Sequence, residues 1–383
     1  MKIGIDIRVI GKNRTGDEAY FFNLVKNLAR LDRENEYFLF TDRDPEKDTA
    51  LKKEISKLEI GNNFKILFIN SPNRFWWNFR ALPNNLGQNP IDIFHTQYIA
   101  PFWLPRKTRL ILTIHDISFN FFPQFIKKND LFFLKTLLPR SIRRAEKIIT
   151  VSESERQKIV DFYKLSPEKV EFAYNGVDFE KLSQKASEGK KSAVRKKYSL
   201  PEKFILYLGT FQPRKNIPVL IEAFDFLRKK FEKQDIKLVL AGNRQAHNFD
   251  QRIDELIEKY NFQNEVIFPG WVDDVDKPIL YQMADCFVFP SLYEGFGLPV
   301  LEAMAAGVPI ACSDIAPLRE IGDGSALFTD PQKPEEFAEN IHKILTDHGL
   351  REKLIESGAV TAQKFSWQKT TGKTLEIYKS VLG

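Results

Sequence analysis

Short β-rich runs alternate with helical patterns along this 383-residue chain, and this alternation restricts the possible folds more than any other feature. Helical patterns, for example at residues 16–31 and 153–163, separate the runs in the first half. Alternation of this kind is typical of a parallel, doubly wound sheet. Strands are predicted in the first half at residues 2–7, 36–41, 64–69, 91–95, 109–114, 147–151 and 169–173.

The pattern begins again after a polar stretch at residues 179–197, which is rich in Lys, Ser and Glu and predicts a linker or linking helix. We therefore expect an α/β protein with two Rossmann-like, doubly wound parallel-sheet domains, residues 1–178 and 198–365. Because ligands of such sheets bind beyond the carboxyl ends of the strands, the two sheets are expected to face a cleft. The second set of predicted strands is 203–208, 236–241, 265–268, 286–289, 308–311 and 325–328. The predicted helices are 215–231, 250–260, 275–284, 299–306, 334–346, 349–358 and 366–382.

The two cysteines, Cys286 and Cys312, exclude a disulfide scaffold and a cysteine-built metal site. Both lie in apolar runs that predict buried strands, which favours a reducing compartment. Asp6 and Arg8 occupy the region where a signal peptide needs an apolar run, and no stretch of about 18 apolar residues follows. We therefore expect a cytoplasmic protein.

The positive charge is concentrated in residues 101–147, where ten Lys or Arg face three acidic residues, whereas the whole chain carries a formal net charge of +6. Phe residues interrupt this basic segment, a combination that suits an anionic membrane surface or a polyanionic substrate. The alternative is an ordinary helix in which Leu131, Leu134 and Leu138 form a buried stripe behind a solvated basic face. Pro139 is expected to break or kink that helix.

A second aromatic and basic cluster lies at residues 74–80, with two adjacent tryptophans. Adjacent residues cannot share one helical face, so at least one of the pair is expected to contact solvent, acceptor or membrane. No motif of nucleic-acid recognition is present, and no nucleic-acid partner is expected. The protein surface predicted to contact either the inner face of a membrane or an acceptor comprises Trp76, Trp77, Lys127, Lys128, Arg143 and Arg144.

The most informative segment is residues 291–302, Ser-Leu-Tyr-Glu-Gly-Phe-Gly-Leu-Pro-Val-Leu-Glu, between a predicted buried strand and a helix. Gly295 and Gly297 allow the backbone to approach a ligand closely. Free amides at the start of the helix, together with the helix dipole, make an anion site. Glu294 in the loop and Glu302 one turn into the helix place two carboxylates beside such an anion; the alternative is a glycine turn with two solvated acids.

Two cations, Arg214 and Lys215, precede the predicted helix at residues 215–231. Cations at a helix amino end oppose the macrodipole, so the pair makes better sense if it holds an external anion such as a diphosphate. A solvated charge pair in a loop is the alternative.

Further polar residues end the strands of the first half. His115, which is followed by Asp116, is suited to contact a phosphate or a sugar hydroxyl, or to exchange a proton. A purely structural role is the alternative. Thr15 and Gly16 close the loop after the first strand, but the three-glycine dinucleotide fingerprint is absent. Residues 175–178 form a turn signal, with Asp178 a further possible cleft residue. No metal site is predicted.

With two glutamates separated by seven residues, Glu294 and Glu302, and with Arg214-Lys215-Asn216 and His115-Asp116 in the expected order, the sequence resembles a retaining glycosyltransferase of family 4. The resemblance covers essentially the whole chain and implies the two-domain GT-B architecture. It also implies transfer of a hexose from a nucleotide-sugar to a glycan or lipid-linked acceptor, without a metal ion or resident cofactor. Retention is expected from same-face attack, with the leaving phosphate taking the acceptor proton.

The resemblance also implies roles for individual residues. Arg214 and Lys215 would neutralise the donor diphosphate, Glu302 would bind the ribose, and Glu294 would face the transferred sugar. His115 would touch the donor from the amino-terminal domain, and a final helix at 366–383 would cross back onto that domain. The implied catalytic residues are His115, Arg214, Lys215 and Glu294. The implied donor-binding residues are Gly16, Gly209, Arg214, Lys215, Gly242, Val272, Glu294, Phe296, Gly297, Leu298 and Glu302.

The sequence departs from this family at residues 15–20, Thr-Gly-Asp-Glu-Ala-Tyr, where many members carry a glycine-rich run ending in Gly-Arg-Tyr. Acids replace small or basic residues there, which leaves the acceptor class open. The opening strand and the Thr-Gly helix start look most like mannosyltransferases, so GDP-mannose is the expected donor and a UDP-sugar the alternative. The glycine fingerprint of a nicotinamide-dependent oxidoreductase is absent from this sequence. A non-catalytic glycan- or lipid-binding module would not need both cations and both glutamates.

Overall fold

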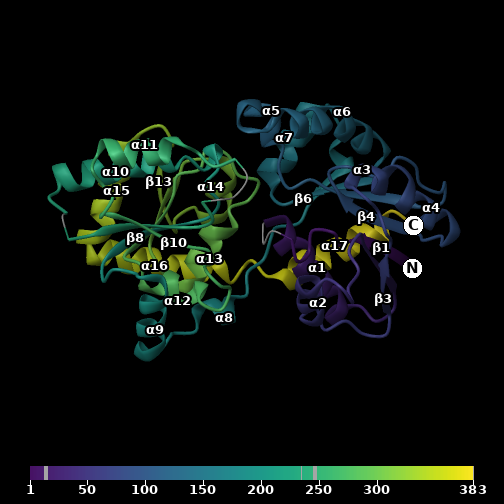
Figure 1. The fold of residues 1–383 in the computed structure, drawn as a ribbon, viewed down its shortest axis with the longest axis horizontal. Coiled ribbons are helices and arrows are strands. Elements are labelled where there is room, and N and C mark those ends of the chain that lie inside the picture. Colours follow the sequence, from purple (N-terminus) through teal and green to yellow (C-terminus); the bar gives the residue numbers. More distant parts are fainter. Residues whose placement is uncertain (13–15, 234, 245–247, 383) are drawn as a thin grey trace. The chain divides into compact units, whose positions relative to one another are not determined.

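The computed structural model describes residues 1–12, 16–233, 235–244 and 248–382. The chain divides into two compact units (Figure 1). The first unit contains Met1–Asn120, Lys128–Gly176 and Trp367–Gly383, and the second contains Phe121–Lys127 and Val177–Ser366. Each unit is built around one parallel sheet, which confirms the predicted α/β class.

The sheet of the first unit has seven parallel strands in the order β3-β2-β1-β4-β5-β6-β7. Ile3 on the interior strand β1 pairs with Tyr37 on one side and Ile93 on the other, and Ile3 and Ile5 are fully buried. Helices cover both faces of this sheet, as is usual for a parallel sheet (Figure 1). The strands are β1 (Lys2–Asp6), β2 (Glu36–Thr41), β3 (Phe64–Phe68), β4 (Ile93–Gln97), β5 (Arg109–Thr113), β6 (Lys147–Thr150) and β7 (Val170–Phe172).

The helices of the first unit include the last helix of the chain. They are α1 (Gly16–Leu31), α2 (Thr49–Ser56), α3 (Arg74–Trp76), α4 (Leu82–Gln88), α5 (Ser118–Phe121), α6 (Lys128–Arg144), α7 (Glu153–Tyr163) and α17 (Trp367–Ser380). A π-turn at Trp77–Ala81 joins α3 to α4. Ser152 accepts a hydrogen bond from Glu155 N at 3.1 Å and so caps α7.

Helix α17 packs against α1 and completes the first core (Figure 1). The Tyr378 hydroxyl lies 2.6 Å from His95 Nδ1, and the Thr370 hydroxyl donates to the Tyr174 carbonyl at 2.5 Å. Burial lowers the pKa of His95 to about 3, with a smaller contribution from the charge of His115, so His95 is a neutral bridge inside the core. The C-terminal helix is therefore part of the first unit although the whole second unit precedes it in the chain.

The sheet of the second unit has six parallel strands in the order β10-β9-β8-β11-β12-β13. Its strands are β8 (Phe204–Leu208), β9 (Lys237–Ala241), β10 (Val266–Gly270), β11 (Cys286–Phe289), β12 (Ile310–Ser313) and β13 (Leu327–Thr329). Its helices are α8 (Phe179–Ser183), α9 (Glu188–Tyr198), α10 (Ile217–Lys230), α11 (Arg252–Lys259), α12 (Lys277–Met283), α13 (Leu298–Ala306), α14 (Ala316–Gly322), α15 (Pro334–Thr346) and α16 (His348–Ala362). Helix α10 packs beside α15, and α13 beside α16.

The predicted linker at residues 179–197 is instead an integral part of the second unit. It forms α8 and most of α9, and Asp178 caps α8 by accepting from Lys181 N at 3.1 Å. Gln282 on α12 donates to the Leu182 and Gln184 carbonyls, and Lys197 pairs with Asp276 at 2.6 Å. A helix was one of the two forms predicted for this stretch, and its polar composition reflects the exposed faces of α8 and α9, whereas a few apolar residues anchor them.

Of the break or kink expected at Pro139, a break does not occur, since α6 continues through it from Lys128 to Arg144. Buried residues on both sides of the proline hold the helix: Leu138 is fully buried, and the Ser141 hydroxyl accepts from Ala100 N at 2.9 Å. Tertiary packing therefore outweighs the one N–H that proline removes. Of the predicted leucine stripe only Leu138 is buried, while Leu131 and Leu134 are half-buried.

Candidate functional site

The loops after β8 and β9 meet at the carboxyl edge of the second sheet. Gly209 N donates to the Ala241 carbonyl and Gly242 N to the Gly270 carbonyl, each at 3.0 Å. Gly242 has φ +156°, and a Cβ atom there would overlap the Gly209 carbonyl oxygen. Glycine is required at residue 242 because no side chain fits between these two backbones.

One 3₁₀ turn, Pro213–Lys215, carries both predicted cations directly before α10. Asn216 ends this turn in the left-handed conformation, φ +56°, which Asn tolerates better than most residues. Its side-chain amide donates to the Pro290 carbonyl at 3.1 Å and to the Pro331 carbonyl at 2.7 Å. Asn216 therefore fixes the loop that presents Arg214 and Lys215.

Glu294 lies between the two cations, as a residue from the loop after β11. Its Oε1 is 2.5 Å from Lys215 Nζ, and its Oε2 is 3.5 Å from Arg214 Nη1. Burial alone would raise the pKa of Glu294, but the charges of Lys215 and Arg214 outweigh it and hold that pKa below its ordinary range. The structure thus brings Glu294 to two adjacent predicted cations that lie about 80 positions earlier in the chain.

Several contacts make this cluster rigid. Leu292 N donates to the Arg214 carbonyl at 2.9 Å, and Arg214 Nη1 donates to the Tyr293 carbonyl at 3.1 Å. Lys215, which is 7% exposed, also lies over the Phe289 ring at 5.0 Å. Two cations and one carboxylate leave a net charge of +1 in a site with little water, where an anion is held more strongly than at an open surface.

Helix α13 begins beside this cluster. Gly297 caps it with φ +113°, and a Cβ atom there would overlap the Leu318 side chain. The first turn of a helix leaves N–H groups without intrahelical partners, which suits an anion near Phe296, Gly297 and Leu298. On the same helix, Glu302 Oε2 accepts a hydrogen bond from the Tyr281 hydroxyl at 3.0 Å.

The loop after β10 contributes one buried and one exposed residue to this edge. Val272 is 4% exposed, whereas Trp271 beside it is 41% exposed. The predicted donor residues of the second unit therefore lie in the loops after β8, β9, β10 and β11, and on the first turns of α13. Loops that share the carboxyl edge of a parallel sheet form the usual ligand site of this fold.

In the first unit, His115 follows β5 and is largely buried. Its Nε2 lies 3.1 Å from Gln97 Oε1 and 3.9 Å from Asp17 Oδ1. The Tyr20 ring contacts the imidazole edge to face, with centroids 5.1 Å apart. Gly16 starts α1 with open space around its Cα, while the predicted partner Thr15 lies outside the described residues.

Two family models match the chain in succession. Residues 14–181 match Glycosyltransferase Family 4, and residues 190–360 match Glycosyl transferases group 1. The chain is 33% identical over 280 residues to the O-antigen chain mannosyltransferase B of Escherichia coli, which covers 73% of this chain and 72% of that protein. The chain belongs to glycosyltransferase family 4.

Solved structures show the same fold for this glycosyltransferase. Sucrose-phosphate synthase from Thermosynechococcus elongatus has a TM-score of 0.79 at 20% identity and covers 100% of this chain and 99% of its own. Anabaena HepE in complex with UDP-glucose has a TM-score of 0.76 at 18% identity and covers 99% and 100%. The two parallel-sheet domains are those of the GT-B architecture.

The predicted membrane or acceptor surface of the glycosyltransferase needs correction at two residues. Trp77 is fully buried, and the Arg8 guanidinium lies over its ring, 4.7 Å from the ring centroid. Consecutive helical side chains point about 100° apart, so Trp76 takes the outer position. Trp76 is 42% exposed, which confirms that one of the pair contacts solvent. Arg144 is half-buried and donates to the Pro101 and Phe102 carbonyls, so its role is structural.

The remaining members of this surface are exposed. Lys128 and Arg143 lie on α6, while Lys127 precedes it in the short segment that groups with the second unit. Within the described ranges, no helix is both long and apolar enough to cross a membrane. The same ranges contain no group of three or more His, Cys, Asp or Glu residues placed to hold a metal ion.

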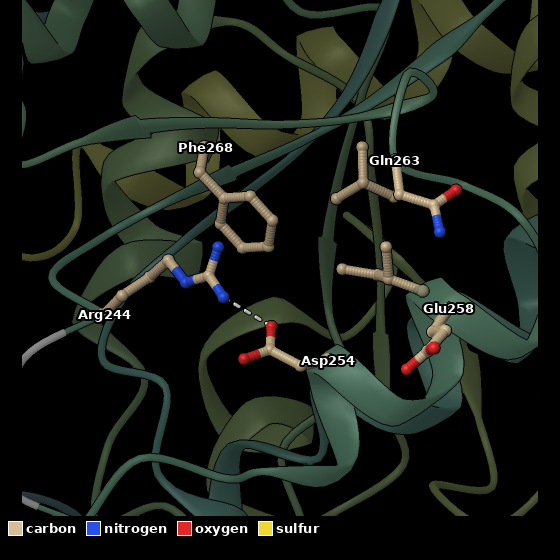
Figure 2. Close-up of a pocket in the computed structure, with 7 residues that line it drawn as sticks. Arg244, Asp254, Glu258, Gln263 and Phe268 are labelled. Atoms are coloured by element: carbon tan, nitrogen blue, oxygen red, sulfur yellow. Dashed lines mark hydrogen bonds and ion pairs between the residues drawn. The ribbon is translucent and has the colours of Figure 1, made fainter.

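A surface hollow of the glycosyltransferase lies between α11 and β10 (Figure 2). Arg244 reaches over the Phe268 ring at 4.3 Å and pairs with Asp254 at 2.5 Å, as the dashed line in Figure 2 shows. Glu258 and Gln263 also line it. None of the predicted donor residues borders this hollow, and its one arginine faces two acids, Asp254 and Glu258, so we do not assign the reaction to it.

Sequence reasoning missed three residues that shape the site. Tyr281 holds Glu302, Phe289 lies beneath Lys215, and Gln97 contacts His115. Tyr281 and Phe289 looked like ordinary core residues of a helix and a strand. Gln97 carried a usable signal, because it is a polar residue at the carboxyl end of a predicted buried strand.

Proposed function

We propose that this glycosyltransferase transfers mannose from GDP-mannose to a hydroxyl of a glycan or lipid-linked acceptor, with retention of configuration. The observation that carries the proposal is the buried cluster of Arg214, Lys215 and Glu294 at the start of α10 and beside α13. The sugar assignment is supported by the relative named O-antigen chain mannosyltransferase B.

In this proposal Arg214 and Lys215 bind the donor diphosphate and stabilise the negative charge that grows on it as the bond to the sugar breaks. Fixed charges aimed at a developing anion in a site with little water are an effective form of catalysis. The first-turn amides of α13 add to the same field. Glu294 orients the transferred sugar, and Glu302 binds the ribose.

The acceptor hydroxyl attacks the face from which the diphosphate leaves, and its proton passes to the departing phosphate oxygen. His115 contacts the donor from the first unit. The two cations and the helix dipole supply the charge stabilisation for which other transferases use a divalent ion, so the proposed reaction requires no metal.

Thermal unfolding against GDP, UDP, ADP, dTDP and NAD, each with and without EDTA, tests the donor assignment. A ligand at about 100 times its Kd adds about 2.7 kcal/mol of stability, which moves the midpoint by several degrees. We expect the largest shift with GDP, unchanged by EDTA, and an α-linked product by NMR when GDP-mannose and an acceptor are supplied. A shift with NAD alone, or a β-linked product, contradicts the proposal.

A UDP-sugar is the second candidate donor, because the structurally similar HepE binds UDP-glucose. The same panel separates the two: a shift with UDP and none with GDP replaces mannose transfer from GDP-mannose by transfer from a UDP-sugar.

We also propose peripheral attachment to the inner face of an anionic membrane through an aromatic and basic surface of the first unit. Phe75 stacks on Phe79 with centroids 5.5 Å apart, and Phe79 contacts Phe102 at 4.9 Å. Arg140 lies over the Phe102 ring at 4.0 Å. The exposed aromatic residues of this surface are Phe75, Trp76, Phe79, Phe102, Trp103 and Phe132.

Exposed aromatic rings enter the interface between headgroups and acyl chains, while neighbouring arginines bind anionic lipids. Co-sedimentation with vesicles containing phosphatidylglycerol is expected at low salt and to weaken as salt rises. Phe132→Ser should lower binding several-fold, and Phe162→Ser, at an exposed ring on α7, serves as the control. Equal binding to neutral and anionic vesicles would contradict the role of the basic residues.

A further inference from the structure

The carboxylate of Glu302 is held at one oxygen and open at the other. Glu302 lies one turn into α13 and is half-buried. Its Oε2 accepts a hydrogen bond from the Tyr281 hydroxyl at 3.0 Å, and in the part of the chain that the structure describes no other hydrogen bond or ion pair reaches this side chain. Its Oε1 therefore keeps its full capacity to accept a hydrogen bond from a ligand.

Tyr281 is the fixed member of this pair. Its side chain is fully buried on α12, and its ring meets the Phe287 ring edge to face, with centroids 5.3 Å apart. Phe287 stacks on Phe289 at 6.0 Å, and Phe289 is the ring over which Lys215 lies. One row of aromatic side chains on β11 therefore supports both the tyrosine that holds Glu302 and the cation proposed to bind the diphosphate.

The Tyr281 hydroxyl keeps its proton and acts as a donor. Burial raises the pKa of Tyr281 well above its ordinary value, and the charge of Glu302 raises it further. The hydroxyl lies 3.0 Å from Glu302 Oε2 and 3.4 Å from the Pro299 carbonyl oxygen, both of which are acceptors. A hydroxyl has a single proton, so the closer carboxylate receives it. Because its ring is fully buried, Tyr281 acts on a ligand only through Glu302.

We propose that Tyr281 positions Glu302 for the ribose of the donor nucleotide: it holds Oε2, turns Oε1 toward a ribose hydroxyl and makes binding depend on that hydroxyl. This inference rests on the proposed function, in which Glu302 binds the ribose. A glutamate side chain has several rotamers, and a partner that fixes one of them before binding lowers the entropy lost on binding. A carboxylate fixed in this way also rejects an analogue that lacks the hydroxyl, since its oxygen loses water and gains no partner.

Isothermal titration of the full-length protein with GDP and with 2′,3′-dideoxy-GDP, which lacks both ribose hydroxyls, measures this dependence. We expect the wild type to bind GDP at least about tenfold more tightly than 2′,3′-dideoxy-GDP. Tyr281→Phe should weaken GDP binding about threefold to tenfold and leave the binding of 2′,3′-dideoxy-GDP within about twofold. Phe keeps the ring, and water can reach the half-buried Glu302, so the variant is expected to fold.

Kinetics give a second measure of the same role. The ribose is separated from the bond that breaks by the diphosphate, so Tyr281 contributes equally to the ground state and the transition state. Tyr281→Phe should therefore raise the KM for GDP-mannose by the same factor as the Kd for GDP and leave kcat nearly unchanged. Steady-state release of mannose from GDP-mannose to water measures both values without a known acceptor.

Tyr37→Phe is the matched control. Tyr37 is a fully buried tyrosine of the first unit, and its hydroxyl lies 2.5 Å from Asp32 Oδ2. Its replacement removes a hydrogen bond of the same kind, so it should lower the melting temperature without changing the preference for GDP over 2′,3′-dideoxy-GDP. A double-mutant cycle with Glu302→Gln shows whether Tyr281 acts through the carboxylate, because the preference should then be small and Tyr281→Phe should reduce it no further.

Three results overturn the proposal. The wild type binds GDP and 2′,3′-dideoxy-GDP equally, or Tyr281→Phe weakens both nucleotides by the same factor, as a purely structural tyrosine would, or Tyr281→Phe changes the preference as much in the Glu302→Gln protein as in the wild type.

Failure of the proposed function gives a different result. UDP and 2′,3′-dideoxy-UDP are titrated in parallel with the guanine nucleotides. If the wild type binds neither GDP nor UDP, the proposed function fails and the role of Tyr281 fails with it. If it binds UDP in place of GDP, only the donor base is wrong, and the uridine pair decides the role of Tyr281 by the same criteria. If it binds GDP without a preference over 2′,3′-dideoxy-GDP, only the role of Tyr281 fails.

Discussion

Replacing Glu294 by Gln should strengthen the binding of a nucleoside diphosphate and at the same time weaken sugar transfer. The Glu294 carboxylate lies 2.5 Å from Lys215 Nζ and 3.5 Å from Arg214 Nη1, so it competes with any other anion for both cations. Gln keeps the shape of the side chain but removes its charge. The net charge of the three side chains then rises from +1 to +2.

Coulomb's law gives the order of magnitude of this effect for an assumed separation. A unit charge about 8 Å from the diphosphate contributes about 2 kcal/mol at an effective dielectric constant of about 20. At 1.36 kcal/mol per factor of ten, loss of that repulsion tightens GDP binding about 30-fold. Transfer falls about 10- to 100-fold, because the charge-assisted hydrogen bond from the sugar to Glu294 is lost.

The same change destabilises the ligand-free protein. The largely buried Lys215 loses the carboxylate that lies 2.5 Å from its Nζ, and breaking a buried ion pair costs about 3–5 kcal/mol. The apparent gain in GDP affinity includes this effect, since the anion replaces the negative charge that Lys215 lost. We therefore expect a lower midpoint of unfolding without ligand and a larger increase on addition of GDP.

Isothermal titration with GDP and steady-state kinetics with GDP-mannose measure the two effects on one preparation. Lys215→Ala is the contrasting variant and should weaken both GDP binding and transfer. Glu339→Gln, which removes an exposed carboxylate paired with Lys230, is the control for charge. If Glu294→Gln weakens GDP binding as Lys215→Ala does, the carboxylate does not compete with the diphosphate and the argument is refuted.

Three further predictions follow from individual contacts. Because the folded pKa of Glu294 is depressed, the carboxylate contributes its full stabilisation above its unfolded pKa of about 4.3, and this contribution is lost as the pH falls through the folded pKa. The midpoint of unfolding should therefore drop more steeply below pH 4 in the wild type than in Glu294→Gln. Parallel curves for the two proteins would contradict this prediction. Gly242→Ala should abolish GDP-induced stabilisation and lower the melting temperature, because the new Cβ overlaps the Gly209 carbonyl. A calorimetric melting temperature equal to that of the wild type would disprove the close approach of the two backbones. Trp77→Ala should cost about 3–5 kcal/mol in urea unfolding, whereas Trp76→Ala should stay within about 0.5 kcal/mol, and equal losses would contradict their different burial.

Much of the fold was predictable because parallel α/β structure has strong local signals. The strands of both units lie within a few residues of their predicted positions, since a buried strand must be apolar and is bounded by turns. Helix α1 begins and ends at the predicted residues, and the Ser152 cap of α7 follows from a four-residue pattern. These features depend on neighbours in the sequence and need no knowledge of distant contacts.

The cation and glutamate motifs were also predictable, but their contacts with each other were not. Composition and spacing placed Arg214, Lys215 and Glu294 at the ends of strands. The ion pair between Lys215 and Glu294 joins residues 79 positions apart, and no local pattern specifies it. The prediction that Glu294 competes with a bound anion for the cations comes from that contact alone.

Burial was the property that local patterns predicted least well. Trp76 and Trp77 are chemically identical neighbours, yet Arg8 covers one ring and solvent contacts the other. The polar residues 179–197 were expected to link two domains, but their few apolar side chains dock α8 and α9 on the second unit. Pro139 was expected to break or kink a helix that packing on both sides keeps continuous.

By itself, the sequence determined that the chain forms two parallel α/β sheets and that its candidate anion-binding residues lie at the carboxyl ends of their strands. Hydrophobic periodicity and turn chemistry act over a few residues, and they are sufficient for both conclusions. Only the tertiary structure decided that α17 completes the first core and that Asp17, not Glu18, lies beside His115. Such choices depend on the packing of residues far apart in the chain, where burial and charge are decided by the whole fold.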